Sequence, residues 1–167
     1  MELITAKYKI ESPANIQLKE MVTADIRGLY SLFKQEGCID SENKFTDEEK
    51  SIFLDAIQTR IATKNKTDKR ASADMLICVD KNKYLLVDAK FNSKSVKNID
   101  PQELTDKLVG SKSLVLSDNY CFGNAFYVLF KSQVINPSQQ NRLKREFQNK
   151  PQFRFMSALQ FRDLFDK

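Results

Sequence analysis

The stretch SADMLICVDKNKYLLVDAKFN, residues 72–92, decides the fold. It contains two apolar runs, MLICV and YLLV, joined by DKNK, a pattern that is typical of two strands and a tight turn. Asp74 precedes the first run, and Asp88, Ala89 and Lys90 follow the second. We therefore expect a β-hairpin that carries three charged side chains at one end.

The register of this hairpin determines whether the two acids meet. Side chains alternate along a strand, so Asp88 and Lys90 share one face of the sheet. A two-residue loop would pair Asp74 with Ala89 and place the two acids on opposite faces. A three-residue loop, with Asn82 in the left-handed conformation, would bring Asp74 opposite Asp88. We favour the second arrangement, or a bend at Asp74 with the same result.

Two carboxylates opposite each other on neighbouring strands repel, so a positive charge has to compensate them. Lys90 can supply this charge. A hard divalent cation is the other possibility, because Mg²⁺ binds through one or two carboxylates together with substrate phosphate and water. The simpler alternative is that the acids are strand-end charges that reach solvent, as most charged side chains do.

Composition limits the function. The chain has 167 residues, 41% of them hydrophobic, which suits a single domain spanning residues 1–167. It has no histidine, which excludes Ser/His/Asp triads and histidine-bound metal centres. Its net charge of +5 favours a polyanionic partner such as nucleic acid, although surplus lysine also serves solubility.

Compartment and membrane association can also be predicted from the sequence. Three widely spaced cysteines, without a C-x-x-C pair, suggest a reducing compartment rather than a disulfide framework. No apolar stretch is long enough to cross a membrane, and the first residues do not resemble a signal peptide. We expect a soluble, cytoplasmic protein without a membrane partner.

The rest of the chain predicts an α/β domain with a mixed central sheet flanked by helices. Helices are expected within residues 14–64, the first at 14–35 and the second from Thr46, where TDEE forms a capping box with Glu49. The hairpin occupies 73–91. Further elements follow in 100–167: a helix from Asp100 to about Gly110 with Glu103 completing its cap, a strand at 124–132, a helix at 136–149 capped by Asn136, a strand at 152–156 and a final helix at 157–165.

Asp74, a 13-residue gap and then Asp88-Ala89-Lys90 on a hydrophobic strand resemble the signature of the PD-(D/E)XK nuclease superfamily, which has a restriction-endonuclease-like fold. The order helix, hairpin, helix, strand over residues 46–132 resembles the common core of that family. The sequence departs from the pattern in two places. Ala73 stands where the family has proline, and Asp88 stands where glutamate is more common.

The resemblance implies metal-dependent hydrolysis of phosphodiester bonds. Asp74, Asp88 and the backbone carbonyl of Ala89 would hold Mg²⁺ or Mn²⁺. Lys90 would orient the attacking water or stabilise charge in the transition state.

Family members often add an acid from a preceding helix. Asp25 is the candidate because it lies within the apolar stripe of the first expected helix, whereas Glu20 and Asp55 point away from the apolar side of their helices. The alternative for Asp25 is a structural pair with Arg60 or Arg70, since a lone buried carboxylate is costly.

Four basic residues in the loops beside the hairpin are candidate phosphate contacts: Lys66, Lys69, Arg70 and Lys94. The expected function is that of a nuclease acting on DNA in preference to RNA, such as a bacterial toxin-type or mobile-element nuclease, which could have a cognate inhibitor protein. Two alternatives remain. One is a catalytically inactive module of the same fold that binds nucleic acid or a protein, and the other is an unrelated α/β interaction protein.

Overall fold

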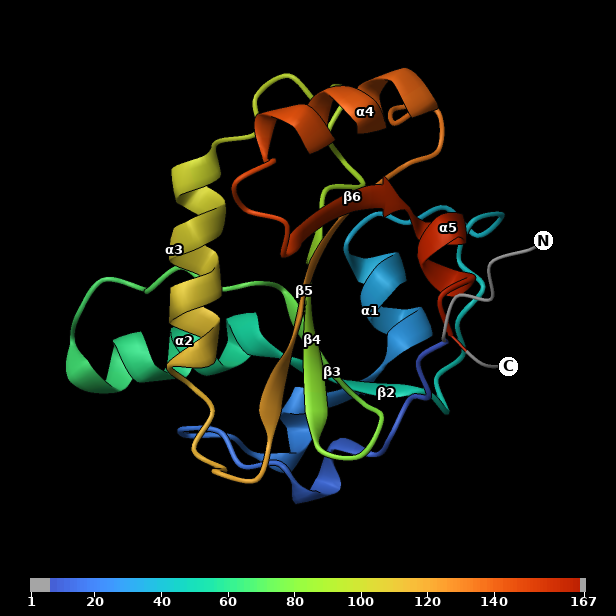
Figure 1. Ribbon diagram of the computed structural model, residues 1–167. Helices are drawn as coiled ribbons and strands as arrows, with labels where there is room; N and C mark the ends of the chain where they lie inside the picture. The colour runs from blue at the N-terminus through green and yellow to red at the C-terminus, as the bar shows by residue number, and fades with distance from the viewer. Residues whose placement is uncertain (1–6, 166–167) are drawn as a thin grey trace.

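A computed structural model of the chain describes residues 7–165, and within them one mixed sheet forms the centre of the molecule (Figure 1). The pairs β1–β2, β2–β3 and β3–β4 are antiparallel, and the pairs β4–β5 and β5–β6 are parallel. The predicted mixed α/β sheet is therefore confirmed. In spatial order its six strands are β1 (Ile26–Gly28), β2 (Lys50–Phe53), β3 (Met75–Val79), β4 (Lys83–Ala89), β5 (Cys121–Phe130) and β6 (Phe153–Ser157).

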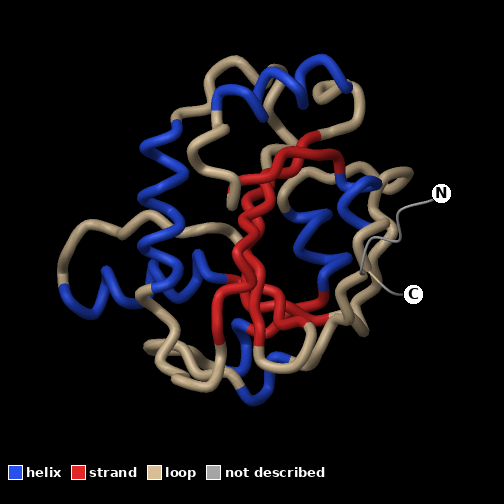
Figure 2. Tube along the Cα trace, viewed as in Figure 1, coloured by secondary structure: helices blue, strands red, loops and turns tan. Residues whose placement is uncertain are grey.

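Helices cover both faces of the sheet (Figures 1 and 2). One face carries α2 (Leu54–Asn65), α3 (Pro101–Lys112) and α4 (Pro137–Glu146), and the other carries α1 (Leu29–Gln35) and α5 (Ala158–Arg162). Alternate residues of each strand supply the two cores: Leu86 packs on the α2/α3 side and Val87 on the α1/α5 side. Within residues 7–165, no helix combines the length and apolar character needed to cross a membrane.

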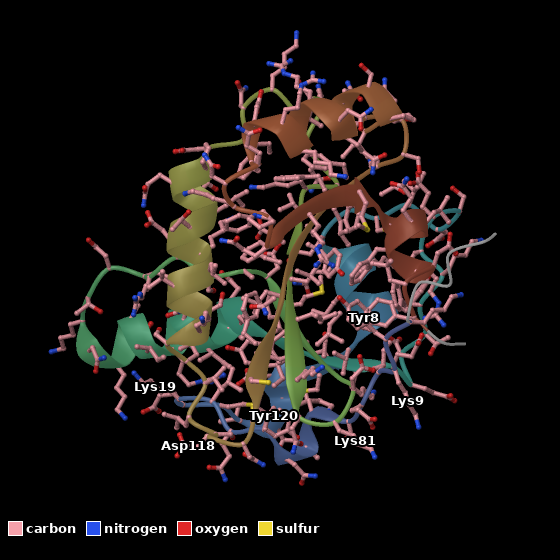
Figure 3. The ribbon with its side chains drawn as sticks, viewed as in Figure 1. Tyr8, Lys9, Lys19, Lys81, Asp118 and Tyr120 are labelled. Atoms are coloured by element: carbon pink, nitrogen blue, oxygen red, sulfur yellow. The ribbon has the colours of Figure 1, made fainter. Side chains whose placement is uncertain are left out.

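The hairpin of β3 and β4 has the three-residue loop that we favoured. Val79 pairs with Lys83, and Asp80, Lys81 and Asn82 all have positive φ values between 48° and 67°. Lys81 marks the tip of the hairpin at the lower end of the sheet (Figure 3). At the other end Met75 pairs with Val87, so the next positions outward in the register are Asp74 and Asp88.

The predicted helix at 14–35 is wrong over most of its length. Residues 13–15 and 23–25 form short 3-10 helices (η1, Pro13–Asn15; η2, Thr23–Asp25), and α1 begins only at Leu29. Between the two 3-10 helices the chain is extended and bridges the segment after α3, where Leu18 lies opposite Val115. The periodic apolar residues thus reach the core from an extended segment, because pairing with a distant part of the chain overrides local helical preference.

The second expected helix begins eight residues later than predicted. The side chain of Glu49 does accept a hydrogen bond from the Thr46 N–H (2.9 Å), but this contact closes a turn instead of opening a helix. Strand β2 follows at Lys50, and α2 begins at Leu54. The capping contact predicted for Glu49 is therefore present, but the predicted helix start is wrong, because residues 50–53 form β2, which lies between β1 and β3 in the sheet.

Caps were predicted better in the second half of the chain. Asp100 caps α3 by accepting from the Gln102 N–H, and Asn136 caps α4 in a capping box with Gln139. The prediction that Glu103 completes the cap of α3 is wrong. Its carboxylate instead lies 3.7 Å from the Nζ of Lys90, at the end of β4.

Candidate active site

Asp74 lies at a bend just before β3, where three elements meet. Its backbone carbonyl accepts a hydrogen bond from the N–H of Leu54, the first residue of α2 (3.0 Å). Its side-chain Oδ2 accepts one from the N–H of Ala89, the last residue of β4 (2.8 Å). These two bonds fix the carboxylate of Asp74 across the strand from Asp88, and we refer to Asp74 and Asp88 together as the carboxylate pair.

Asp88 is almost completely buried, with 1% of its side chain exposed, and its two oxygens have different surroundings. Oδ2 lies 2.9 Å from the Nζ of Lys107 and 3.5 Å from the Nζ of Lys90. Oδ1 is buried and has no hydrogen-bond partner among the described residues. Buried carboxylate oxygens are normally satisfied, so this orphaned atom calls for a ligand or water.

The carboxylate pair is electrostatically strained. Burial raises the pKa of Asp74, and the charge of Asp88 raises it further, to about 7, despite the opposing hydrogen bond from Ala89. For Lys107, burial alone would lower the pKa, but the charge and hydrogen bond of Asp88 outweigh it and raise the pKa above its ordinary value. An elevated carboxyl pKa beside a buried ammonium group is the kind of perturbation that clusters at functional sites.

Two further acids lie near the carboxylate pair: Glu36, which the sequence analysis did not consider, and Asp55, which it set aside. Glu36 directly follows α1, and its backbone carbonyl accepts from the Asn92 side chain in the loop after β4 (3.5 Å). Burial raises the pKa of Glu36, and the charges of Asp55 and Asp88 act in the same direction. Asp55, which the sequence analysis set aside, is in the first turn of α2, and 45% of its side chain is exposed.

Helix α3 supplies two more groups that the sequence analysis did not assign to the site. Glu103 and Lys107 are four residues apart, and their side chains approach to 3.5 Å. Both also contact the end of β4, Lys107 through Asp88 and Glu103 through Lys90. The Glu-x-x-x-Lys spacing on a helix that follows the Asp-Ala-Lys strand was the available signal, but such spacing usually marks a solvent-exposed pair.

Asp25 was the candidate for a fourth catalytic acid. It has instead the alternative role that the sequence analysis considered, a structural ion pair. Its oxygens accept two hydrogen bonds from the guanidinium of Arg60, at 2.9 and 3.0 Å, and a third from the Val22 N–H. Burial opposes ionisation, but these bonds prevail and lower the pKa of Asp25. Its carboxylate therefore serves to join η2 to α2. Glu20, also set aside, pairs with Lys64.

The structure separates the four predicted phosphate contacts. Lys69 pairs with Asp55 (2.5 Å) and so lies near the site. Lys66 is at the C-terminal end of α2, opposite the end that carries Asp55. Arg70 binds the Ser113 hydroxyl beyond the C-terminal end of α3 (3.0 Å), whereas Lys107 reaches the site from the middle of that helix. In the described chain neither Lys66 nor Arg70 contacts the carboxylate pair.

Lys94 lines a cavity of about 240 Å³ that borders the site. Lys90 lines the same cavity, so one lysine connects it to Asp88. The lining contains two ammonium groups, two hydroxyls and an amide, and it contains no carboxylate, so it is suitable for an anion. Its six residues are Lys90, Ser93, Lys94, Ser95, Asn98 and Ile99.

The residues present fit a hard divalent cation. Asp74, just before β3, and Asp88, on β4, offer oxygen ligands side by side, and Asp88 Oδ1 lacks a partner in the part of the chain that the structure describes. Within residues 7–165 no three acidic or cysteine side chains form a complete metal cage. Mg²⁺ does not need one, because it commonly binds through one or two carboxylates and completes its shell with water and phosphate.

Comparison with protein-family models, with curated proteins and with solved structures finds no match to this chain.

Proposed function

We propose that this protein is a divalent-metal-dependent nuclease that hydrolyses phosphodiester bonds, with DNA as its preferred substrate. The observation that supports this proposal most is the carboxylate pair at the end of β3 and β4, where a buried Asp88 oxygen has no partner within residues 7–165 and two lysines approach the other oxygen. The antiparallel hairpin, α3 and the parallel strand β5 follow in the order on which the resemblance to PD-(D/E)XK nucleases rests.

Each residue of the site has a role in this proposal. Asp74, Asp88 and the backbone carbonyl of Ala89 would hold Mg²⁺ or Mn²⁺, which when bound lowers the pKa of water and neutralises phosphate charge. Glu36 and Asp55 add negative potential around the cation. Lys90 has 25% of its side chain exposed, so its ammonium group can orient the attacking water or stabilise charge that develops on the phosphate.

The cavity beside Lys90 supplies a place for substrate. A phosphate of the nucleic acid backbone would bind between Lys90 and Lys94, and this contact would orient the chain toward the carboxylate pair. Lys69 is a second contact on the α2 side. The net charge of +5 favours approach of a polyanion.

A second candidate function is a catalytically inactive module that binds nucleic acid. The observation that favours it is the position of Lys107, whose ammonium group lies 2.9 Å from Asp88 Oδ2 and offsets part of the charge that a cation would offset. In that case Lys90 and Lys94 would bind phosphate without cleavage.

A cleavage assay separates the two functions. Purified protein is incubated with supercoiled plasmid, linear DNA and structured RNA, in Mg²⁺, in Mn²⁺ and in EDTA. We expect cleavage of DNA with either metal and none in EDTA. Asp88→Asn and Lys90→Ala should each reduce the rate by about 100-fold or more, the effect of removing one group that stabilises transition-state charge.

Asp118→Asn is the matched control for the aspartate variant, because it makes the same change at an exposed position near the lower end of the sheet (Figure 3). It should cleave at the wild-type rate. Salt-sensitive binding without cleavage in any metal would select the inactive module. Cleavage that persists in EDTA, or in Asp88→Asn, would contradict the proposed active site.

A further inference from the structure

Lys107 contacts Asp88, whose carboxylate would have to be free to bind a metal ion. Its Nζ lies 2.9 Å from Asp88 Oδ2, and 17% of its side chain is exposed. Lys90, the lysine of the sequence motif, is farther from the same oxygen, at 3.5 Å. The shorter of the two ion pairs of Asp88 thus involves a helix residue and not the motif lysine.

This ion pair leaves the site incompletely neutralised. Asp88 Oδ1 is buried and without a partner among the described residues, and Asp74 occupies the next register position across the hairpin. Lys90 and Lys107 each lie within ion-pair distance of both Asp88 and Glu103, whereas Asp74 forms no ion pair with another described residue. A divalent cation would find unsatisfied oxygen there, but it would also meet the positive charge of Lys107.

Glu103 gives Lys107 a second position. The Glu103 Oε1 lies 3.5 Å from the Lys107 Nζ, one helical turn away on α3, and half of the Glu103 side chain is exposed. A lysine has a flexible four-carbon stem and three donors, so its ammonium group can exchange one carboxylate for another over a short distance.

We propose that Lys107 is a resident counter-ion of Asp88, and that it transfers to Glu103 when a divalent cation binds the carboxylate pair. This inference rests on the proposed metal-dependent function. Lys107 then keeps the site folded in the absence of metal, and it weakens metal affinity because binding requires its displacement. A ligand that competes with an internal group binds less tightly by the free energy of that displacement.

Calorimetric titration with Mn²⁺ alone tests this inference in the full chain. Lys107→Met should bind Mn²⁺ about tenfold more tightly than the wild type, which corresponds to about 1.4 kcal/mol. Lys107→Arg keeps a cation at the position and should bind close to wild type. Lys112→Met removes a lysine from the same helix, one that lies over the Phe122 ring, and should not change the affinity.

The outcomes distinguish this inference from the proposed function. Equal or weaker Mn²⁺ affinity in Lys107→Met, with clear binding by the wild type, would overturn the displacement and leave the metal-dependent function standing. No Mn²⁺ binding by the wild type or any variant would overturn both.

A measurement on the unaltered side chain covers the case in which Lys107→Met does not fold. The wild type carrying ¹³C at the lysine ε-carbons is titrated with Mg²⁺ and followed by NMR, with the Lys107 signal assigned by its loss in Lys107→Arg. The signal should shift and saturate with Mg²⁺, while the Lys112 signal stays in place. A Lys107 signal that does not move at saturating Mg²⁺ would overturn the transfer.

Discussion

Replacing Asp74 with asparagine should make the metal-free protein more stable at neutral pH. In the native protein the pKa of Asp74 is raised to about 7 by burial and by the charge of Asp88, whereas the ordinary value is 3.8. Asparagine cannot ionise, and its side-chain oxygen can still accept the hydrogen bond from the Ala89 N–H. The substitution therefore removes the repulsion and keeps the contact.

The magnitude follows from proton linkage. Between about pH 4 and pH 7 the native protein holds the Asp74 proton and the unfolded chain has released it, so stability falls as the pH rises. Each pH unit in this window contributes about 1.4 kcal/mol, which gives a cost of up to about 4 kcal/mol at pH 8. The gain from Asp74→Asn should thus be near zero at pH 4 and reach up to about 4 kcal/mol at pH 8.

Urea unfolding in EDTA, followed by circular dichroism at pH 4, 5, 6, 7 and 8, measures this gain for Asp74→Asn against the wild type. Asp118→Asn, at an exposed position, should show no gain at any pH. Two results would refute the reasoning: a variant less stable than the wild type at pH 8, or a difference that does not change with pH. Adding Mg²⁺ at pH 8 should stabilise the wild type and leave Asp74→Asn unchanged, since only the wild type has the carboxylate pair.

Four further predictions follow from the site and its surroundings. Lys90→Ala should abolish cleavage and retain Mn²⁺ binding, as measured by a plasmid assay beside calorimetry. Glu36→Gln should weaken Mn²⁺ binding severalfold, because it removes negative potential near Asp88, and unchanged affinity would exclude the residue from the site. Asp25→Ala should lower the free energy of unfolding by about 2 to 4 kcal/mol and leave the cleavage rate of the folded protein intact, since its partner is Arg60. Lys94→Ala should weaken DNA binding and reduce its salt dependence by about one phosphate contact, and an unaltered salt slope would place the substrate elsewhere.

The hairpin was predictable because its determinants are local. Two apolar runs separated by a short polar loop fix the strands, and an asparagine that tolerates positive φ fixes the three-residue turn. Once the loop length is set, the pairing of Met75 with Val87 and the adjacency of Asp74 and Asp88 follow from counting. The caps at Asp100 and Asn136 are local in the same way.

The parts that were not predicted depend on contacts between distant segments. The N-terminal region is extended because Leu18 bridges Val115, nearly a hundred positions later. Helix α1 starts at Leu29 because the Asp47 side chain accepts from the Ser31 N–H, and Gly28 admits that approach: a Cβ there would lie 2.1 Å from Asp47 Oδ1. No periodicity in the sequence encodes either contact.

The site shows the same division between local and distant determinants. The motif identified Asp74, Asp88 and Lys90, which lie in the hairpin or directly beside its ends. Glu36 directly follows α1 and Lys107 is on α3, on opposite faces of the sheet, so their proximity to the carboxylate pair depends on the packing of these two helices.

The central claim is that Asp74 and Asp88 hold a divalent cation at the end of the hairpin. The most direct measurement is an anomalous difference map from crystals soaked in MnCl₂. We predict a peak within bonding distance of carboxylate oxygens of both residues, about 2.0 to 2.3 Å from each. A map without density at this position, in crystals where the side chains of both aspartates are visible, would contradict the account.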